Sequence, residues 1–257
     1  MKRRIHYTHK YLLNPTHPVT VALIGCGGTG CRVLTSLAMI HMSLRALGHP
    51  GLHVTVYDGD MVDLPNIGRQ LFYECDLSQN KAIVLVSRIN RSFGLAWNAI
   101  PQHFTRKSMK AGNIFISCVD NIQSRLLIAD ILSDKSIRHY NGESKAMYWI
   151  DYGNTQKSGQ VILGTLGKIE QPKSRKYITV AELPTITERF DLTKIKDKDS
   201  GPSCSHAQAL AKQDLFINTS LATLGSHLLW ELLREGGTDK AGLYLNLENI
   251  RTNSIPV

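Results

Sequence analysis

The sequence predicts an α/β protein with a mainly parallel sheet and helices on both faces, extended by antiparallel strands in the C-terminal half. Three observations predict this class. Short apolar, β-branched runs alternate with segments that carry apolar residues at helical spacing, as in parallel strands and their crossover helices. A glycine cluster joins the first of these strands to the first helix. From about residue 146 onward, short strands separated by Gly, Ser and Lys replace the alternation.

The elements of the N-terminal half follow from this alternation. Nearly continuous apolar runs are typical of strands that are buried on both faces of a sheet. Segments with one apolar face indicate the helices that cover such a sheet. The predicted strands lie at 19–24, 53–57, 113–118 and 146–151, and the predicted helices at 31–47, 81–93 and 121–132.

Two shorter strands, 160–166 and 177–180, predict an antiparallel extension of the same sheet. The stretch 183–202 is the most loop-like part of the chain, and loops of this length tend to serve a function. A chain of 257 residues suits one α/β domain rather than two.

The last elements are a long helix and a final strand. Ser205 and Gln208 form a capping-box pattern, so the helix is expected to begin there. Its apolar face ends near the pair Gly236 and Gly237, a helix stop signal. The final strand is predicted at 242–247.

The composition excludes several classes of protein. No apolar run is long enough to span a bilayer, and the basic N-terminus lacks the apolar segment of an export signal. We therefore expect a cytoplasmic protein with no membrane partner. The five cysteines are scattered without a C-x-x-C pair, which argues against disulfides and against structural zinc. Basic residues gather at 2–10 and 168–176 with few aromatics among them, so nucleic acid is not the expected main partner, despite a net charge of +9.

The glycine cluster has the spacing G-x-G-G-x-G and lies directly between a strand and a helix. Glycines at this position let a tight turn bring backbone N–H groups against a phosphate. The motif alone indicates a nucleotide and does not distinguish a dinucleotide from a triphosphate. Its glycines are Gly25, Gly27, Gly28 and Gly30.

A second polar cluster favours a triphosphate. Asp58 follows the second strand, where a carboxylate can accept hydrogen bonds from both ribose hydroxyls; the alternative is a loop aspartate that caps a turn with Gly59. Asn66, Arg69 and Lys81 follow, and two cations with an amide donor suit the β- and γ-phosphates and the charge at an attacked α-phosphate. A dinucleotide oxidoreductase has no use for these charges.

Asp120 and Asn121 follow the strand 113–118. A carboxylate at the carboxyl end of a parallel strand, opposite a phosphate-binding turn, is a natural ligand for Mg²⁺. The alternative is that Asp120 or Asn121 caps the helix that begins near Gln123, and the two roles can coexist.

These motifs together resemble the ThiF/MoeB/HesA family, whose members are relatives of the ubiquitin-activating enzymes. The resemblance is specific over residues 19–135 and looser beyond. The chain length, Pro202–Ser205 and the segment Gln213–Asn218 are most similar to the ThiF-like member of PRTRC plasmid cassettes. The residues that carry the family resemblance are Gly25, Gly27, Gly28, Gly30, Asp58, Asp60, Val62, Asn66, Arg69, Gln70, Lys81, Cys118, Asp120 and Asn121.

The resemblance implies a Rossmann-like fold and one adenylation domain, residues 1–257. Its nucleotide-binding half would be 19–135 and its carrier-protein-binding half 136–257, including the loop 183–204. The implied enzyme is a homodimer that uses ATP and Mg²⁺ to adenylate the C-terminal carboxylate of a small ubiquitin-like or sulfur-carrier-like protein. A downstream conjugating enzyme is a further implied partner.

The resemblance also assigns residues. Asp58 would bind the ribose, and Asp120 would hold Mg²⁺. Family members send an arginine from an N-terminal helix into the neighbouring subunit's site, for which Arg3 and Arg4 are the candidates here. The implied phosphate contacts are Asn66, Arg69 and Lys81, and the nucleotide-binding set is completed by Asp60, Gln70 and Asn121.

Cys204 lies between the loop-like stretch and the predicted helix start. A thiol beside a helix N-terminus can have its pKa lowered below about 8.5, which makes the thiolate available. In activating enzymes of this kind a cysteine in such a place can take the acyl group as a thioester. The alternative is a small residue packed under the helix start.

Two other functions remain as alternatives. The glycine turn and Asp58 alone would also suit an NAD(P)-dependent oxidoreductase. The positive net charge would suit a non-catalytic nucleotide- or DNA-binding protein of a plasmid cassette.

Overall fold

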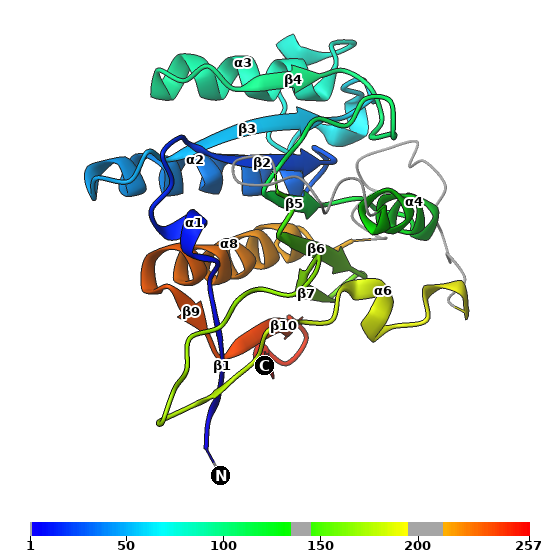
Figure 1. Ribbon diagram of the computed structural model, residues 1–257. Coiled ribbons are helices and arrows are strands. Elements are labelled where there is room, and N and C mark those ends of the chain that lie inside the picture. Colours follow the sequence, from blue (N-terminus) through cyan, green and yellow to red (C-terminus); the bar gives the residue numbers. More distant parts are fainter. Residues whose placement is uncertain (1, 135–144, 195–212) are drawn as a thin grey trace.

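The computed structural model describes residues 2–134, 145–194 and 213–257 (Figure 1). Cys204, Ser205 and Gln208 lie outside the described residues.

An eight-stranded sheet with the order β11-β10-β7-β6-β5-β2-β3-β4 forms the centre of the molecule. Strands β4, β3, β2, β5 and β6 run parallel, and β7, β10 and β11 continue the sheet antiparallel. The predicted fold class is therefore confirmed. The strands are β2 (Val19–Ile24), β3 (Leu52–Tyr57), β4 (Asn98–Ile100), β5 (Ile114–Ser117), β6 (Tyr148–Asn154), β7 (Ser158–Thr165), β10 (Lys240–Asn246) and β11 (Arg251–Pro256).

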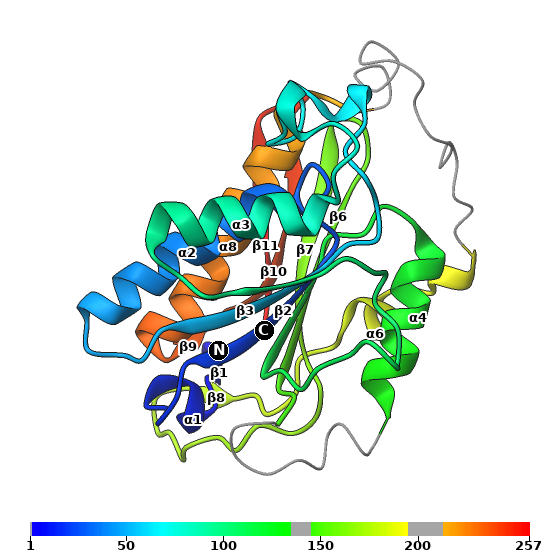
Figure 2. The ribbon, with the colours of Figure 1, turned by 90° about the horizontal axis from the view of Figure 1, so that it is seen from above.

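Helices cover both faces of the sheet (Figure 2). One face carries α2 (Gly30–Ala46), α3 (Lys81–Phe93) and α8 (Ile217–Glu235), and the other carries α4 (Ile122–Ser133) and the short α6 (Ile186–Arg189). Short elements connect the rest: α1 (Lys10–Leu13), η1 (Leu64–Asn66), η2 (Glu74–Asp76) and η4 (Leu192–Lys194). Among the described residues, no helix combines the length and the apolar character needed to cross a membrane.

Local sequence explains where the helices begin and end. Asn80 caps α3, because its side-chain oxygen accepts a hydrogen bond from the Ile83 amide at 3.1 Å. Asn121 caps α4 in the same way through the Ser124 amide at 2.8 Å. Helices α3 and α8 end at Gly94 and Gly236, which adopt the left-handed conformation that glycine tolerates best.

The strand order reverses at β2, which lies between β3 and β5. On one side of β2 lie β3 and β4, which the chain reaches through the helices α2 and α3. On the other side lie β5 and β6, which α4 connects. At such a reversal the carboxyl ends of two neighbouring strands open a crevice, where ligands bind in open α/β sheets. The two strand ends here are held together because the Cys118 amide donates to the Ile24 carbonyl at 2.8 Å.

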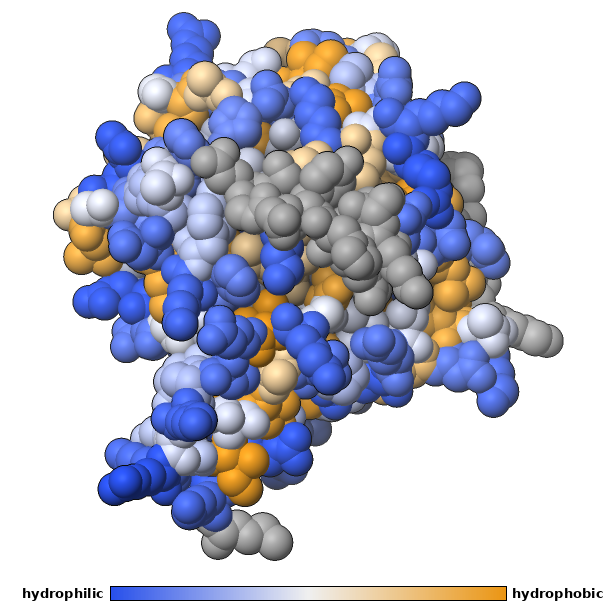
Figure 3. Space-filling model, in the orientation of Figure 1, coloured by the Kyte–Doolittle hydropathy of each residue, from blue (hydrophilic) through white to orange (hydrophobic). Residues whose placement is uncertain are grey.

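The predicted strand 177–180 does not extend the main sheet, which corrects that expectation. Its two strand residues, β8 (Ile178–Thr179), pair in parallel with β1 (Arg4–Tyr7), and β1 pairs antiparallel with β9 (Gly237–Thr238). The reason is that β10 already occupies the edge of β7. The small sheet brings the two basic segments of the sequence side by side, and hydrophilic side chains cover much of the projection that it forms (Figure 3).

The C-terminal elements also differ from expectation. Helix α8 begins at Ile217 and is not a continuous helix from Ser205, because residues 213–216 are not helical. The Phe216 amide instead donates to the side chain of Asp214 at 2.9 Å. A further strand, β11, follows the predicted last strand, and its polar sequence lacks the alternation that would have revealed it.

A buried ion pair joins β5, α4 and β6 next to the crevice. Arg125 of α4 contacts both oxygens of Asp151 in β6 at 3.2 and 3.1 Å, and the Asp151 side chain is only 1% exposed. The same guanidinium donates to the Val119 carbonyl at 2.6 Å, and Ser117 donates to Asp151 at 2.6 Å. The pair therefore holds the backbone immediately before Asp120.

Replacing Asp151 with alanine is expected to lower the free energy of unfolding by about 3–5 kcal/mol, because Arg125 would remain buried without its counter-charge. Urea denaturation measures this change. The control is Asp130→Ala, which removes a pair between two exposed side chains, Arg106 and Asp130, and should cost under about 1 kcal/mol. Equal losses in the two variants would contradict the interpretation.

Candidate functional site

The glycine turn lies at the carboxyl ends of the neighbouring strands β2 and β5. A Cβ on Gly25, whose φ is +90°, would lie 2.9 Å from the Cys118 carbonyl oxygen, and one on Gly30 would lie 1.9 Å from the Gly25 oxygen. Both positions therefore require glycine. At Gly27 no atom lies within 4 Å of an added Cβ, so this part of the turn faces open space. The turn has a closely packed side and a free side that a phosphate can approach.

Asp58 connects the turn to the loop after β3. Its carboxylate accepts hydrogen bonds from the Cys26 amide at 2.5 Å and from the Asp60 amide at 2.9 Å. Asp58 is 7% exposed, and burial raises the pKa of its carboxyl although both amides favour the ionised form. The hydrogen bond from the Asp60 amide shows that Asp58 caps a turn, as the alternative interpretation expected. A carboxylate has further lone pairs, so Asp58 can also accept a hydrogen bond from a ligand.

Lys81 is the first residue of α3 and points at the same loop. Its Nζ lies 3.2 Å from Asp60 Oδ2, and the lysine side chain is only 10% exposed. The backbone of this loop is fixed by Asn80, whose side-chain amide donates to the carbonyls of Asp58 and Asp60 at 2.9 and 3.1 Å. A nearly buried cation therefore pairs with Asp60 and lies close enough to Asp58 for their charges to interact.

The segment between β3 and α3 supplies three more predicted residues. Arg69 donates from Nη1 to the side-chain oxygen of Gln213 at 2.6 Å, and burial lowers its pKa whereas Asp120 counteracts this effect. Arg69 Nε and Gln70 Oε1 are buried and have no hydrogen-bond partner among the residues that the structure describes. The side-chain oxygen of Asn66 accepts from the Asp63 amide at 3.0 Å. Buried polar atoms without partners are costly to stability.

Two roles were considered for Asp120 and Asn121, a ligand for Mg²⁺ and the N-cap of α4, and only Asn121 forms the cap. Asn121 caps α4, whereas Asp120 is exposed and its Oδ1 accepts only from the Asn121 side chain at 3.1 Å among the recorded hydrogen bonds of the described residues. Asp120 is close enough to Arg69 for their charges to interact. The carboxylate therefore remains available for a cation or a further donor.

The described cysteines at the crevice are not suited to act as nucleophiles. Cys26 and Cys31 are buried, and burial raises the pKa of both thiols and of Cys118. A raised pKa lowers the fraction of reactive thiolate. The ranges described by the structure contain no group of three or more His, Cys, Asp or Glu side chains placed to hold a metal ion.

Two residues of the C-terminal half reach the crevice and were not predicted as part of the site. Asn218 in the first turn of α8 accepts a hydrogen bond from Thr29 of the turn at 2.8 Å, and it also donates to Gln213 at 2.9 Å. The sequence did contain a signal, since Asn218 is a polar residue on the apolar face formed by Ile217 and Leu221.

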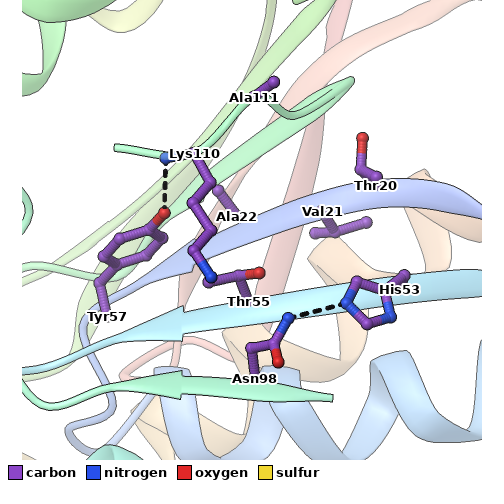
Figure 4. Close-up of a pocket in the computed structure, with 9 residues that line it drawn as sticks. All are labelled: Thr20, Val21, Ala22, His53, Thr55, Tyr57, Asn98, Lys110 and Ala111. Atoms are coloured by element: carbon purple, nitrogen blue, oxygen red, sulfur yellow. Dashed lines mark hydrogen bonds between the residues drawn. The ribbon is translucent and has the colours of Figure 1, made fainter. Parts of the chain in front are cut away.

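A hollow of about 150 Å³ lies elsewhere and is lined by residues of β2, β3 and β4 (Figure 4). In it the Lys110 side chain extends toward Thr55, and Asn98 contacts His53 at 2.9 Å. None of the predicted site residues borders it. Its lining residues are Thr20, Val21, Ala22, His53, Thr55, Tyr57, Asn98, Lys110 and Ala111.

The chain belongs to the ThiF family, whose model matches residues 12–237. It is similar to the adenylyltransferase and sulfurtransferase MOCS3 of Xenopus laevis, with 31% identity over 118 residues, which cover 43% of this chain and 24% of that protein. The corresponding protein of Danio rerio is 29% identical over 119 residues, covering 44% of this chain and 24% of its own.

Solved structures share the fold. A crystal structure of PaaA has a TM-score of 0.60 at 16% identity and covers 93% of this chain and 64% of PaaA. E. coli MccB has a TM-score of 0.60 at 15% identity and covers 95% of this chain and 63% of MccB. The chain thus spans under two thirds of these two structures and 24% of both MOCS3 proteins.

Alanine substitutions of the two middle glycines of the turn, Gly27 and Gly28, are expected to change the free energy of unfolding by different amounts. A Cβ on Gly28 would lie 2.6 Å from the side-chain nitrogen of Asn218, whereas one on Gly27 meets no atom within 4 Å. Gly28→Ala should therefore lower the free energy of unfolding by about 1–3 kcal/mol through overpacking, and Gly27→Ala should change it much less. Urea denaturation of both variants measures the difference. Equal stabilities would show that the contact between the turn and α8 is not tight.

Proposed function

We propose that the protein is an ATP-dependent adenylating enzyme acting on the C-terminal carboxylate of a small ubiquitin-like or sulfur-carrier-like protein. The observation that carries this proposal is that four features lie near the carboxyl ends of neighbouring parallel strands. They are the glycine turn, the cations Arg69 and Lys81, and the exposed carboxylate of Asp120. Membership of the ThiF family supports it, as do the adenylyltransferase relatives. E. coli MccB has been solved with ATP and with MccA.

Different groups of the chain bind different parts of ATP. The free side of the turn at Gly27 offers backbone amides to the phosphates, in front of the N-terminus of α2. Asp58 accepts hydrogen bonds from the ribose with the lone pairs that Cys26 and Asp60 leave free. The remaining contacts come from Asp60, Asn66, Arg69, Gln70, Lys81 and Asn121.

Asp120 is the proposed ligand for Mg²⁺. Its carboxylate is exposed and forms no recorded ion pair within the described residues, which suits an ion that is typically held by one or two carboxylates plus nucleotide phosphates. When bound, Mg²⁺ neutralises phosphate charge. The backbone before Asp120 is fixed by Arg125, so the carboxylate is held at the crevice.

Catalysis depends on orientation and charge. The carrier's terminal carboxylate attacks the α-phosphorus, an acyl–phosphate bond forms, the bond to the bridging oxygen breaks, and pyrophosphate leaves with that electron pair. The nucleophile is already ionised, so no general base is needed. Arg69 and Lys81 stabilise the charge that moves onto the phosphate oxygens, and the turn holds the chain of phosphates in line.

We further propose a homodimer in which an N-terminal arginine reaches the neighbouring subunit's site, with a downstream conjugating enzyme as a later partner. Arg3 is already paired with Asp239 of the same chain, its Nε lying 2.7 Å from the carboxylate. Arg4 is exposed on β1 and has no recorded ion pair in the described part of the chain, so it is the better candidate.

The exchange of labelled pyrophosphate into ATP tests the adenylation. It is measured with candidate carrier proteins that are encoded by neighbouring genes. Lys81→Ala and Asp120→Asn are each expected to lower the exchange rate by about 10²–10³-fold, as loss of one transition-state contact does. Lys110→Ala is the matched control, because Lys110 borders the separate hollow.

Two results would overturn parts of this proposal. Absence of exchange with every intact carrier would remove the adenylation. Equal exchange with carriers that lack their last residues would remove the C-terminal carboxylate as the substrate.

Cys204 is proposed to take the acyl group from the adenylate as a thioester, releasing AMP. The proposal rests on its sequence position after the stretch 183–202. Wild-type protein is then expected to form a conjugate with its carrier that thiols cleave and that Cys204→Ser abolishes. Cys75→Ser, which alters an exposed cysteine, is the control. A carrier that is activated without any thiol-sensitive conjugate would contradict the thioester step.

A further inference from the structure

We propose that Gln213 and Asn218 form a positioning relay that orients Arg69 toward the phosphate turn without neutralising its charge. The inference rests on the proposed function, in which Arg69 contacts the phosphates. It assigns roles to two residues of the C-terminal half that lie outside the predicted nucleotide-binding half.

Three hydrogen bonds define the relay. Thr29 Oγ1 donates to Asn218 Oδ1 at 2.8 Å, and Asn218 Nδ2 donates to Gln213 Oε1 at 2.9 Å. The same Gln213 oxygen accepts from Arg69 Nη1 at 2.6 Å. Three consecutive hydrogen bonds thereby join the glycine turn, the start of α8 and the loop after β3.

Close packing fixes the middle of the relay. Asn218 is 2% exposed, and its side-chain nitrogen lies 2.6 Å from the position of a Cβ on Gly28. A buried amide must keep its hydrogen bonds, since losing one costs about 1–3 kcal/mol. Asn218 therefore has one favourable orientation, with its oxygen toward Thr29 and its nitrogen toward Gln213, and this orientation presents the Gln213 oxygen to Arg69.

The chemistry of the last contact distinguishes Arg69 from the four arginines that pair with carboxylates. A carboxylate partner would neutralise the guanidinium and compete with a phosphate, whereas an amide oxygen orients it and leaves its charge. Within the described residues, Arg69 Nε has no recorded hydrogen-bond partner, and Arg69 has no recorded ion pair with a carboxylate. Other arginines do pair with carboxylates: Arg3 with Asp239, Arg88 with Asp76, Arg106 with Asp130, and Arg125 with Asp151.

Gln213→Glu tests the relay, because it keeps the shape of the side chain and replaces the neutral oxygen with a charged one. The KM for ATP in pyrophosphate exchange is expected to rise about tenfold or more, the effect of losing one hydrogen bond to a charged group. The fall in kcat should be smaller, and the melting temperature should not fall, since the introduced carboxylate would pair with Arg69.

Two controls separate positioning from general structural damage. Gln171→Glu alters a glutamine that bonds the backbone of Tyr7 in the small sheet, and it should leave the KM for ATP unchanged. In an Arg69→Ala background, Gln213→Glu should have no further effect on ATP affinity, because the two residues act through one contact.

The outcomes for the relay and for the proposed function are distinguishable. A wild-type KM for ATP in Gln213→Glu, with exchange intact, would overturn the relay and leave the adenylation standing. If wild-type protein shows no exchange, calorimetric titration with ATP decides the relay. Weaker binding by the variant would support it, and equal binding would overturn it.

Discussion

The close approach of the glycine turn to the end of β5 is the constraint on which the site depends. A side chain at Gly25 would collide with the Cys118 carbonyl, so this position keeps the carboxyl ends of β2 and β5 in contact. That contact lies where the strand order reverses, which is where an open α/β sheet can bind a ligand. Asp58 extends the arrangement to β3 through the Cys26 amide. The ends of β2 and β5 are thus aligned by backbone contacts, and the end of β3 is joined to them by a hydrogen bond between a carboxylate and an amide.

The charges around this edge are held in two different ways. Arg125 and Asp151 neutralise each other in a buried pair that supports the backbone before Asp120. Arg69 instead donates a hydrogen bond to the side-chain amide oxygen of Gln213, and Asp120 is exposed. The structural pair can tolerate burial because its charge is compensated, whereas a residue that binds phosphate must keep its own charge for the ligand. The same side-chain chemistry therefore serves packing at one position and is left available for a ligand at another.

The two halves of the chain are not independent at this site. The turn and the loop after β3 come from the predicted nucleotide-binding half, but Gln213 and Asn218 from the C-terminal half complete the contacts between them. Helix α8 also packs beside α2, the helix that follows the turn (Figure 1). The ThiF-family model likewise spans both halves, from residue 12 to residue 237. Residues of both predicted halves therefore take part in the hydrogen bonds around the glycine turn.

The sequence by itself determined four of the five parallel strands, the helices α2, α3 and α4 between them, and the position of the glycine turn, but not the short strand β4. Those features follow from short-range rules, namely apolar periodicity, asparagine caps and the glycines that a tight turn requires. Only the tertiary structure decided the pairing of β8 with β1, the start of α8 at Ile217 and the contact of Gln213 with Arg69. Each of these joins segments far apart in the chain or depends on which sheet edge is already occupied. Such contacts leave no local pattern, because their energy comes from a partner that the neighbouring residues do not specify.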